Sequence, residues 1–152
     1  MDNEQLKTKV LSLVPNAEVA MGKQFLEATV APNKLYALAK ALKESDDTYF
    51  DYLFCLTGID WPEGFGVIYH LTSTKFSHII VLRTITPNRE TPTLDTVCDL
   101  WKTADFLERE VYDLLGINFK NHPDMRRIFL DERWEGHPLR KDYVDHINII
   151  EK

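Results

Sequence analysis

Glutamate, histidine and aspartate side chains that could exchange protons are concentrated between residues 105 and 124. Glu108 and Glu110, together with His122 and Asp124, could be drawn as a general acid and base. Residues i and i+2 of a helix point in different directions, however, so Glu108 and Glu110 cannot both face one substrate. We therefore expect no catalytic residue in this chain. A stand-alone carboxylate or histidine enzyme remains the rival hypothesis.

The same charged residues could instead form a structural clamp. Arg126 and Arg127 follow the acidic stretch after a turn. We hypothesise that they fold back and make bidentate bonds to Glu108 or Glu110, because a guanidinium matches a carboxylate in shape and charge. The alternative is a solvated run of charges, in which exposed pairs contribute little to stability.

The sequence offers no pattern for a metal or a nucleotide. Its two cysteines, Cys55 and Cys98, are too few and too far apart for an iron–sulfur cluster or a structural zinc site. We expect both thiols to be small buried hydrophobic groups. His122 and His137 lack a helical His-x-x-x-His partner, and the six glycines form no phosphate-binding loop. No metal or cofactor bound by this chain is therefore expected.

Charge indicates a protein partner rather than a nucleic acid. The net charge is −6, whereas phosphate binding requires a surplus of basic residues on one face. Between residues 122 and 142 five basic residues balance five acidic ones, namely Arg126, Arg127, Arg133, Arg140 and Lys141 against Asp124, Asp131, Glu132, Glu135 and Asp142. Trp134 and Tyr143 are residue types that anchor interfaces, although Trp134 could also plug the core of its own chain.

The spacing of apolar residues predicts the elements that must position these groups. Helical spacing is found at residues 4–14 and again from Pro32, and a hairpin is expected between Glu18 and Val30. Three extended runs follow, at residues 50–59, 65–74 and 78–86. We expect a three-stranded antiparallel meander with two helices on one face.

Two more helical stretches are predicted, one from Thr93 to Trp101 and one that begins near Asp105 and ends at Gly116. After Phe119 the sequence is apolar and charged but has no period, which is typical of a segment that orders against another surface. The prediction is an α+β fold, mostly an antiparallel sheet with helices packed on it. Residues 1–120 form the core domain and residues 121–152 an irregular, extended C-terminal arm of the same domain.

The acidic N-terminus does not look like a signal peptide, and no apolar run is long enough to span a membrane. We expect an intracellular protein that reaches a membrane only through other proteins.

Residues 108–143 closely resemble the C-terminal block of the 30-kDa (C-type) subunit family of respiratory complex I, the NADH:quinone oxidoreductases. The matching positions are Glu108-Arg109-Glu110, Tyr112-Asp113, Gly116, Phe119, His122-Pro123-Asp124, Arg126-Arg127-Ile128, Trp134, Gly136 and Pro138 to Tyr143. Upstream, Thr57–Asp60, Val67–Leu71 and Thr93–Trp101 also resemble the family, so the resemblance covers about residues 45–143 well and the N-terminal part only in outline.

The resemblance implies a non-catalytic peripheral-arm subunit of a proton-translocating enzyme, which supports the quinone-reducing module in respiratory electron transport. It implies that flavin, iron–sulfur clusters and quinone lie in neighbouring subunits. The chief partner would be the 49-kDa-type subunit that forms the quinone cavity, on the cytoplasmic side of the membrane. Homologous subunits of ferredoxin- or F420-linked dehydrogenases and of membrane-bound nickel–iron hydrogenases are the alternatives. The residues expected to form the clamp and interface are Glu108, Arg109, Glu110, Asp113, His122, Asp124, Arg126, Arg127, Trp134, Arg140, Lys141, Asp142 and Tyr143.

Overall fold

The computed structural model of the protein describes residues 1–145, and the predicted end of the arm, 146–152, lies outside the described residues. The elements in chain order are α1 (Asn3–Leu13), β1 (Glu18–Met21), β2 (Leu26–Thr29), α2 (Pro32–Glu44), β3 (Tyr52–Trp61), β4 (Gly64–Thr72), β5 (Ile79–Thr86), β6 (Thr93–Asp95), α3 (Ala104–Leu115) and β7 (Asn118–Lys120). The α+β prediction is confirmed.

The main sheet contains the predicted meander. β3, β4 and β5 pair antiparallel in sequence order, and β1 and β2 form the predicted hairpin. The sheet order β1-β2-β5-β4-β3 joins the two units through a parallel pairing of β2 with β5. Alternate residues of β4, such as Val67, Tyr69 and Leu71, are buried, as the two-residue period of a strand requires.

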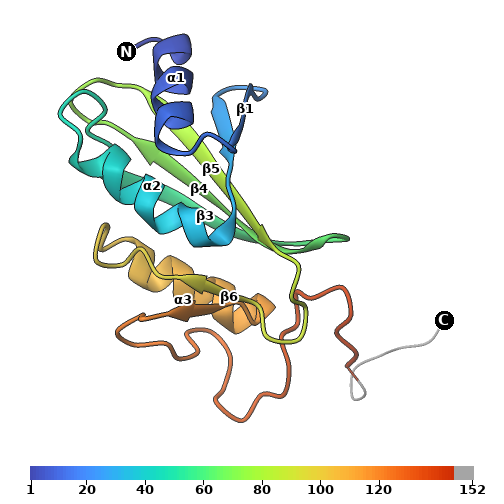
Figure 1. The fold of residues 1–152 in the computed structure, drawn as a ribbon. Helices are drawn as coiled ribbons and strands as arrows, with labels where there is room; N and C mark the ends of the chain where they lie inside the picture. Colours follow the sequence, from blue (N-terminus) through green and yellow to red (C-terminus); the bar gives the residue numbers. More distant parts are fainter. Residues whose placement is uncertain (146–152) are drawn as a thin grey trace.

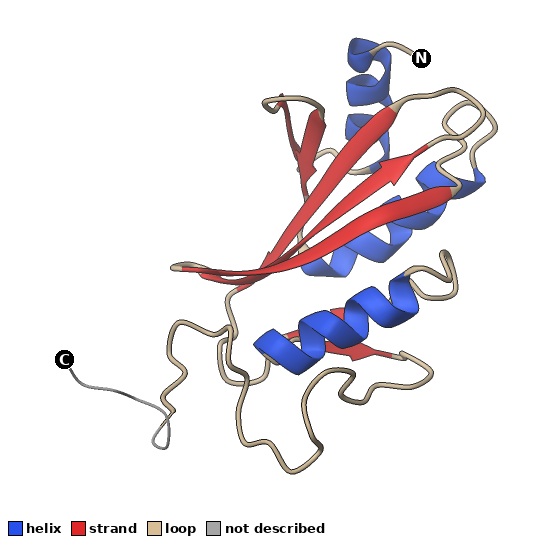
Figure 2. Cartoon of the chain, turned by 180° about the vertical axis from the view of Figure 1, so that it is seen from behind, coloured by secondary structure: helices blue, strands red, loops and turns tan. Residues whose placement is uncertain are grey.

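Helices α1 and α2 cover one face of this sheet (Figures 1 and 2). Asp2 caps the N-terminus of α1 in a capping box, in which its carboxylate accepts the Gln5 backbone N–H and the Gln5 side chain accepts the Asp2 backbone N–H. α2 carries Pro32 in its first turn, where its missing N–H is not needed, and buries the predicted apolar stripe that includes Leu35 and Leu42. The sequence signals for the ends and the apolar faces of these two helices therefore agree with the structure.

The predicted helix from Thr93 to Trp101 was wrong. Residues 93–95 form β6, which pairs parallel with β7, and the chain then turns. Leu94, Val97 and Trp101 are all buried, as the helical pattern implied, but from a strand and turns. The physical reason is that the backbone N–H groups donate to acceptors outside a helix. The Thr96 N–H donates to the Lys120 carbonyl, and the Val97 N–H donates to the Glu108 carboxylate of α3.

Helix α3 begins and ends where the sequence predicted and lies against β3. Gly116 follows its last residue in the left-handed conformation, with φ 74°. At Gly58 of β3 the helix approaches closely, because a Cβ there would lie 2.7 Å from Val111 and 2.6 Å from Leu115. The absence of a side chain at Gly58 therefore sets the distance between helix and sheet.

Residues 121–145, which we call the arm, contain neither helix nor strand. They run past the C-terminal end of α3 and on toward the edge of the main sheet (Figure 2). Among residues 1–145 we found no helix with the length and apolar character needed to cross a bilayer.

Replacing Gly58 by valine should push α3 from the sheet. Overpacking a close contact costs about 1–3 kcal/mol of unfolding free energy, so urea unfolding should show a loss in this range for Gly58→Val. Gly22→Ala is the control, because the atoms nearest to its Cβ all belong to the flexible side chain of Glu27. Equal stability of both variants and the parent would contradict this packing.

Candidate functional site

The buried carboxylate of Asp113, in the last turn of α3, binds the arm. Its Oδ1 accepts a hydrogen bond of 2.7 Å from Arg127. Its Oδ2 accepts three backbone N–H groups in succession, from Ile128 at 3.0 Å, Phe129 at 2.7 Å and Leu130 at 3.0 Å. One carboxylate thus supplies the acceptors that a helix or strand would otherwise provide for this turn.

The pKa of Asp113 shows which contacts dominate. Burial alone would raise the pKa, but the Arg127 guanidinium and the backbone N–H groups outweigh it and lower the pKa from 3.8 to about 2. The carboxylate therefore stays charged and keeps all its acceptors at neutral pH.

Arg127 links α3 to a later part of the arm. Its guanidinium also donates to the Asp113 carbonyl at 3.0 Å, and to the carbonyls of Trp134 at 3.0 Å and Gly136 at 2.8 Å. His137 places Nδ1 2.9 Å from the Asp113 carbonyl. One arginine, with a side chain only 13% exposed, therefore joins the last turn of α3 to a residue of the arm that lies nine positions after the arginine.

A second anchor fastens the end of the arm to the sheet. Asp60 of β3 binds Arg89 through both carboxylate oxygens, at 2.8 and 3.1 Å, and accepts the Lys141 backbone N–H at 2.9 Å. Arg89 lowers the pKa of Asp60, so this carboxylate is charged too. Arg140 pairs with Asp142 and donates to the Arg89 carbonyl. Asp142 also lies 3.9 Å from Arg89.

Arg109 of α3 binds the backbone of the arm near Arg126 and Arg127. Its buried guanidinium donates to the carbonyls of Arg126 and Arg127, at 3.3 and 3.4 Å. It also lies 3.8 Å from the carboxylate of Asp124 and 4.0 Å from that of Asp105.

The predicted partners of the arginine clamp, Glu108 and Glu110, were wrong. Arg127 does fold back onto the helix, but it binds Asp113. Arg126 pairs with Asp124 in its own turn and keeps a side chain that is 61% exposed. Helical phase explains the error, since Glu108 faces inward away from the arm's arginines and Glu110 faces solvent.

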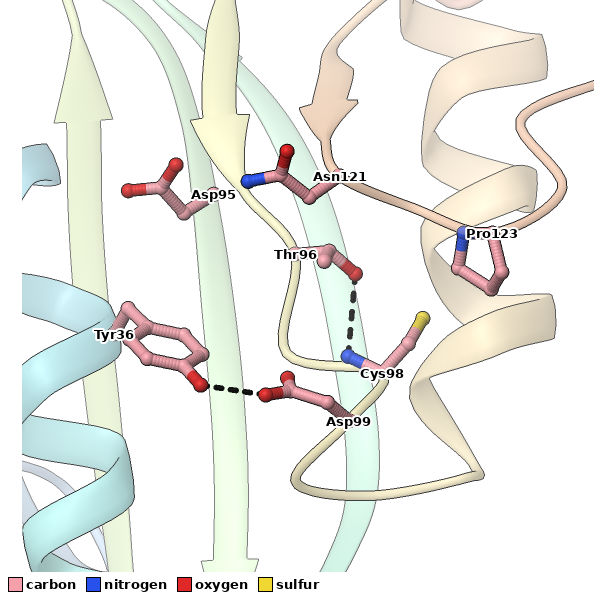
Figure 3. A pocket seen from close by; sticks show the side chains of 7 residues that line it. All are labelled: Tyr36, Asp95, Thr96, Cys98, Asp99, Asn121 and Pro123. Carbon is pink, nitrogen blue, oxygen red and sulfur yellow. Dashed lines mark hydrogen bonds between the residues drawn. The ribbon is translucent and has the colours of Figure 1, made fainter.

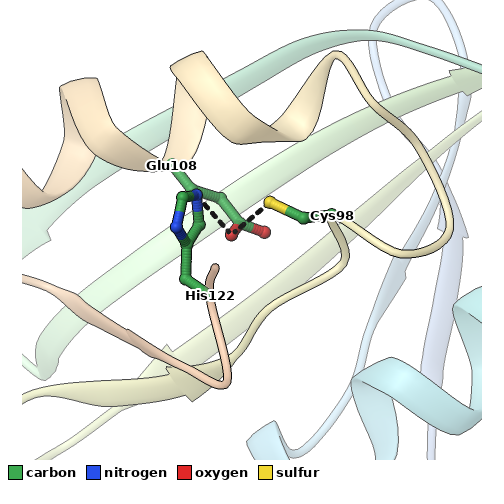
Figure 4. Close-up of side chains that lie close together, drawn as sticks. All are labelled: Cys98, Glu108 and His122. Carbon is green, nitrogen blue, oxygen red and sulfur yellow. Dashed lines mark hydrogen bonds and ion pairs between the residues drawn. The ribbon is translucent and has the colours of Figure 1, made fainter. Parts of the chain in front are cut away.

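Glu108 instead binds the loop after β6 (Figure 4). It accepts the Val97 backbone N–H at 2.8 Å, the Thr96 hydroxyl and the Cys98 thiol at 3.3 Å. The buried His122 ring lies on its other side, with Nε2 3.9 Å from Oε2. Burial raises the pKa of Glu108 to about 7, although its hydrogen bonds act in the opposite sense.

The two cysteines are less buried than the small buried groups that the sequence predicted. Cys55 and Cys98 are both half-buried free thiols. Cys55 lies 3.5 Å from the Thr57 hydroxyl, and Cys98 donates to Glu108. Burial raises the pKa of Cys98 to about 12, so its thiol is a poor nucleophile at neutral pH.

A cavity of about 580 Å³ opens beside this cluster, between α2, the loop after β6 and the start of the arm (Figure 3). It is lined by Tyr36, Asp95, Thr96, Cys98, Asp99, Asn121 and Pro123. The Tyr36 hydroxyl donates to the Asp99 carboxylate across its mouth. Sequence patterns did not single out this cavity, because its lining comes from segments that are far apart in the chain.

Comparison with known proteins assigns the family. The family described as "Respiratory-chain NADH dehydrogenase, 30 Kd subunit" matches residues 28–146. The chain belongs to this 30-kDa subunit family. It is 54% identical over 110 residues to a C/D-type subunit of NADH-quinone oxidoreductase from Phocaeicola vulgatus, a match that covers 72% of this chain and 21% of the relative. The chain thus spans about a fifth of the length of that relative.

A shorter relative and two solved structures agree with this assignment. A C-type subunit of NADH-quinone oxidoreductase from Geotalea uraniireducens is 43% identical over 122 residues, covering 77% of this chain and 73% of the relative. A trypsin-resistant fragment of Nqo5 is 31% identical with a TM-score of 0.62, covering 82% of this chain and 99% of the fragment. A polypeptide of an archaeal membrane-bound sulfane sulfur reductase is 27% identical with a TM-score of 0.79, covering 95% and 86%.

In this member of the 30-kDa family, the arm exposes large apolar side chains on its outer side. Phe129 is 64% exposed, Leu139 60% and Trp134 37%. Trp134 is therefore not a core residue of its own chain, so the alternative that it plugs the core was wrong. Tyr143 is half-buried and lies against Gly136, where a Cβ would come within 3.0 Å of its ring.

Sequence reasoning missed Asp60 and Arg89 as site residues. Asp60 was noted only within the stretch that resembles the family, and Arg89 lies in a turn-rich break. A carboxylate near the end of an otherwise apolar strand was the available signal. Its partner Lys141 is 81 residues away, which no local pattern connects.

Arg127→Ala should destabilise the fold far more than Arg126→Ala. The first variant leaves the Asp113 carboxylate buried without its cation, which costs on the order of 3–5 kcal/mol. The second removes an exposed pair, worth at most about 1 kcal/mol. Urea unfolding measures both, and Glu110→Ala should match the parent because Glu110 is exposed. Equal losses for the two arginine variants would contradict the assigned roles.

Acid should release the arm through Asp113. A carboxyl with a pKa lower in the folded than in the unfolded state contributes stability above its unfolded pKa, here 3.8, and loses it as the pH falls toward 2. The contribution is about 2–3 kcal/mol, at about 1.4 kcal/mol per pKa unit. The stability difference between the parent and Asp113→Asn should shrink by this amount over that window. If the stability difference between the two proteins stayed constant over this pH range, protonation of Asp113 would not affect the stability.

Proposed function

We propose that this chain is a non-catalytic peripheral-arm subunit of a proton-translocating NADH:quinone oxidoreductase and supports its quinone-reducing module. Membership of the 30-kDa family supports this proposal, as do the names of the relatives that are 40–54% identical. In this proposal flavin, iron–sulfur clusters and quinone belong to neighbouring subunits, and the chain lies on the cytoplasmic side of the membrane. It reaches the membrane through the complex.

The partner that we propose is the D-type, 49-kDa subunit. The relative from Phocaeicola vulgatus carries the double designation C/D, and this chain matches only 21% of its length. Relatives in Bacteroides fragilis and Bacteroides thetaiotaomicron carry the same designation. A single polypeptide with both letters supports close association of the C and D parts in those proteins. We extend that association to this chain as a contact between separate surfaces.

The observation that carries the proposal is the contrast between the two sides of the arm. On the inner side, Asp113 and Asp60 hold the backbone through buried charged hydrogen bonds. On the outer side, Phe129, Trp134 and Leu139 are exposed. Exposed apolar side chains on a fixed backbone suit docking, because little ordering entropy remains to be lost when a partner binds.

The arm's charges fit a protein partner as well. Arg133 has a side chain that is 91% exposed, and it pairs with Asp131 in its own turn. Arg126 and Asp124 form a similar exposed pair. Alternating charges around apolar anchors resemble the polar rim of an interface, which favours one orientation of the partner over others.

Phe129→Ala and Leu139→Ser should weaken assembly without unfolding the chain. Both side chains are more than half exposed, so neither contributes much to the core. We expect each tagged variant to recover less D-type subunit from solubilised membranes of its own host, and the doubly substituted chain to recover at least about tenfold less, the factor that 1.4 kcal/mol represents. NADH:quinone activity of the membranes should fall in parallel.

The matched control is Phe76→Ala, which removes an exposed aromatic ring from the loop between β4 and β5, away from the arm. It should recover the D-type subunit as the parent does. Normal recovery by the double variant would refute docking through the arm. Turnover of a substrate by the purified chain alone would instead support the rival enzyme.

A further inference from the structure

We propose that Cys98, Glu108 and His122 form a binding site for a thiophilic divalent metal ion of the zinc class. The three residues come from the loop after β6, from α3 and from the start of the arm, and their side chains converge (Figure 4). The site lies apart from Phe129, Trp134 and Leu139, the residues of the proposed docking surface. The sequence alone predicted no metal bound by this chain.

The distances between the ligand atoms fit a small ion. The thiol sulfur of Cys98 lies 3.3 Å from Glu108 Oε2, and His122 Nε2 lies 3.9 Å from the same oxygen. The three ligand atoms all lie within 4.8 Å of one another. Tetrahedral bonds of about 2.0–2.3 Å separate ligand atoms by about 3.3–3.8 Å. Side-chain adjustments of an ångström or less would therefore complete this geometry.

Asp105 supplies an independent observation. Its Oδ1 is buried and has no hydrogen-bond partner, and it lies 3.7 Å from His122 Nε2. Asp105 and Glu108 are three positions apart on α3, so both carboxylates lie on the same side of the helix. The Arg109 guanidinium lies 4.0 Å from this oxygen, beyond hydrogen-bonding distance. A metal ion held by Cys98, Glu108 and His122 would place a cation near the unpartnered oxygen of Asp105 and offset the repulsion between the two carboxylates.

Hydrogen bonds from Thr96 and Val97 already orient the Glu108 carboxylate. The Val97 N–H holds Glu108 Oε1 and the Thr96 hydroxyl holds Oε2, which is the role that outer hydrogen bonds play around metal ligands. The ion could enter through the adjoining cavity, since Cys98 lines both spaces and the carboxylates of Asp95 and Asp99 lie at the cavity wall (Figure 3).

Binding would change the tautomer of His122. Without metal, Nδ1 accepts the Asp124 backbone N–H at 3.0 Å, so the ring proton on Nε2 is donated to the Asp105 backbone carbonyl at 3.2 Å. Coordination through Nε2 breaks the bond to the Asp105 carbonyl and moves this proton to Nδ1, and the Asp124 amide must turn away. The Cys98 thiol proton leaves to solvent as the sulfur–metal bond forms. Metal binding is thereby coupled to the first turn of the arm.

Cobalt titration of the full chain, freed of metal with a chelator, tests the site. We expect one Co²⁺ per chain, with thiolate-to-cobalt absorption in the near ultraviolet and the visible bands of tetrahedral cobalt. Cys98→Ser should lose the thiolate band and bind at least about tenfold more weakly. Cys55→Ser is the matched control and should keep both. Absence of the band in the parent, or its persistence in Cys98→Ser, would overturn the proposal.

Nitrogen-15 NMR of the histidine rings gives a second readout that needs no variant of Cys98. With Zn²⁺, the His122 ring, assigned by comparison with His122→Gln, should change from the Nε2–H to the Nδ1–H tautomer. A ring that keeps Nε2–H at saturating Zn²⁺ would refute coordination. Neither measurement depends on assembly with a D-type subunit, so failure of the docking proposal would leave the metal result unaffected.

Discussion

The arm depends on one interaction, the buried carboxylate of Asp113 with the residues that fold over it. A segment without helix or strand must still satisfy its backbone polar groups. Asp113 accepts three consecutive backbone N–H groups, while its partner Arg127 donates to three carbonyls, of Asp113, Trp134 and Gly136. This charged pair therefore replaces the hydrogen-bond ladder that regular secondary structure would have provided.

The charged residues of helix α3 point in different directions, so the helix contacts the loop after β6, the arm and the solvent. Glu108 faces inward and holds the loop after β6, and Arg109 supports the carbonyls at the start of the arm. Glu110 faces solvent, and Asp113 binds the arm itself. The dense charge of this helix, which resembles an active site in the linear sequence, is largely the support for two irregular segments.

Buried charges that hold an irregular segment also account for the fixed backbone of the proposed docking surface. Residues that pack poorly against their own core would normally stay mobile and lose entropy on binding. In the arm, Asp113 and Asp60 fix the backbone from within, so Phe129 and Leu139 remain outside on an ordered support. Such an arrangement fits the docking role proposed for this member of the 30-kDa subunit family.

The sequence alone determined the family, the α+β class, the helix that starts at Pro32 and the end of α3 at Gly116, because these depend on local spacing and backbone preference. It also located the arm by its lack of period. Only the tertiary structure decided that residues 93–95 form a strand, since β7 supplies the partner. It alone chose Asp113 over Glu108 for Arg127, and it joined Asp60 to Lys141 across 81 residues. Contacts of this kind follow from where elements pack, and a linear pattern carries no information about the distance between residues brought together only by folding.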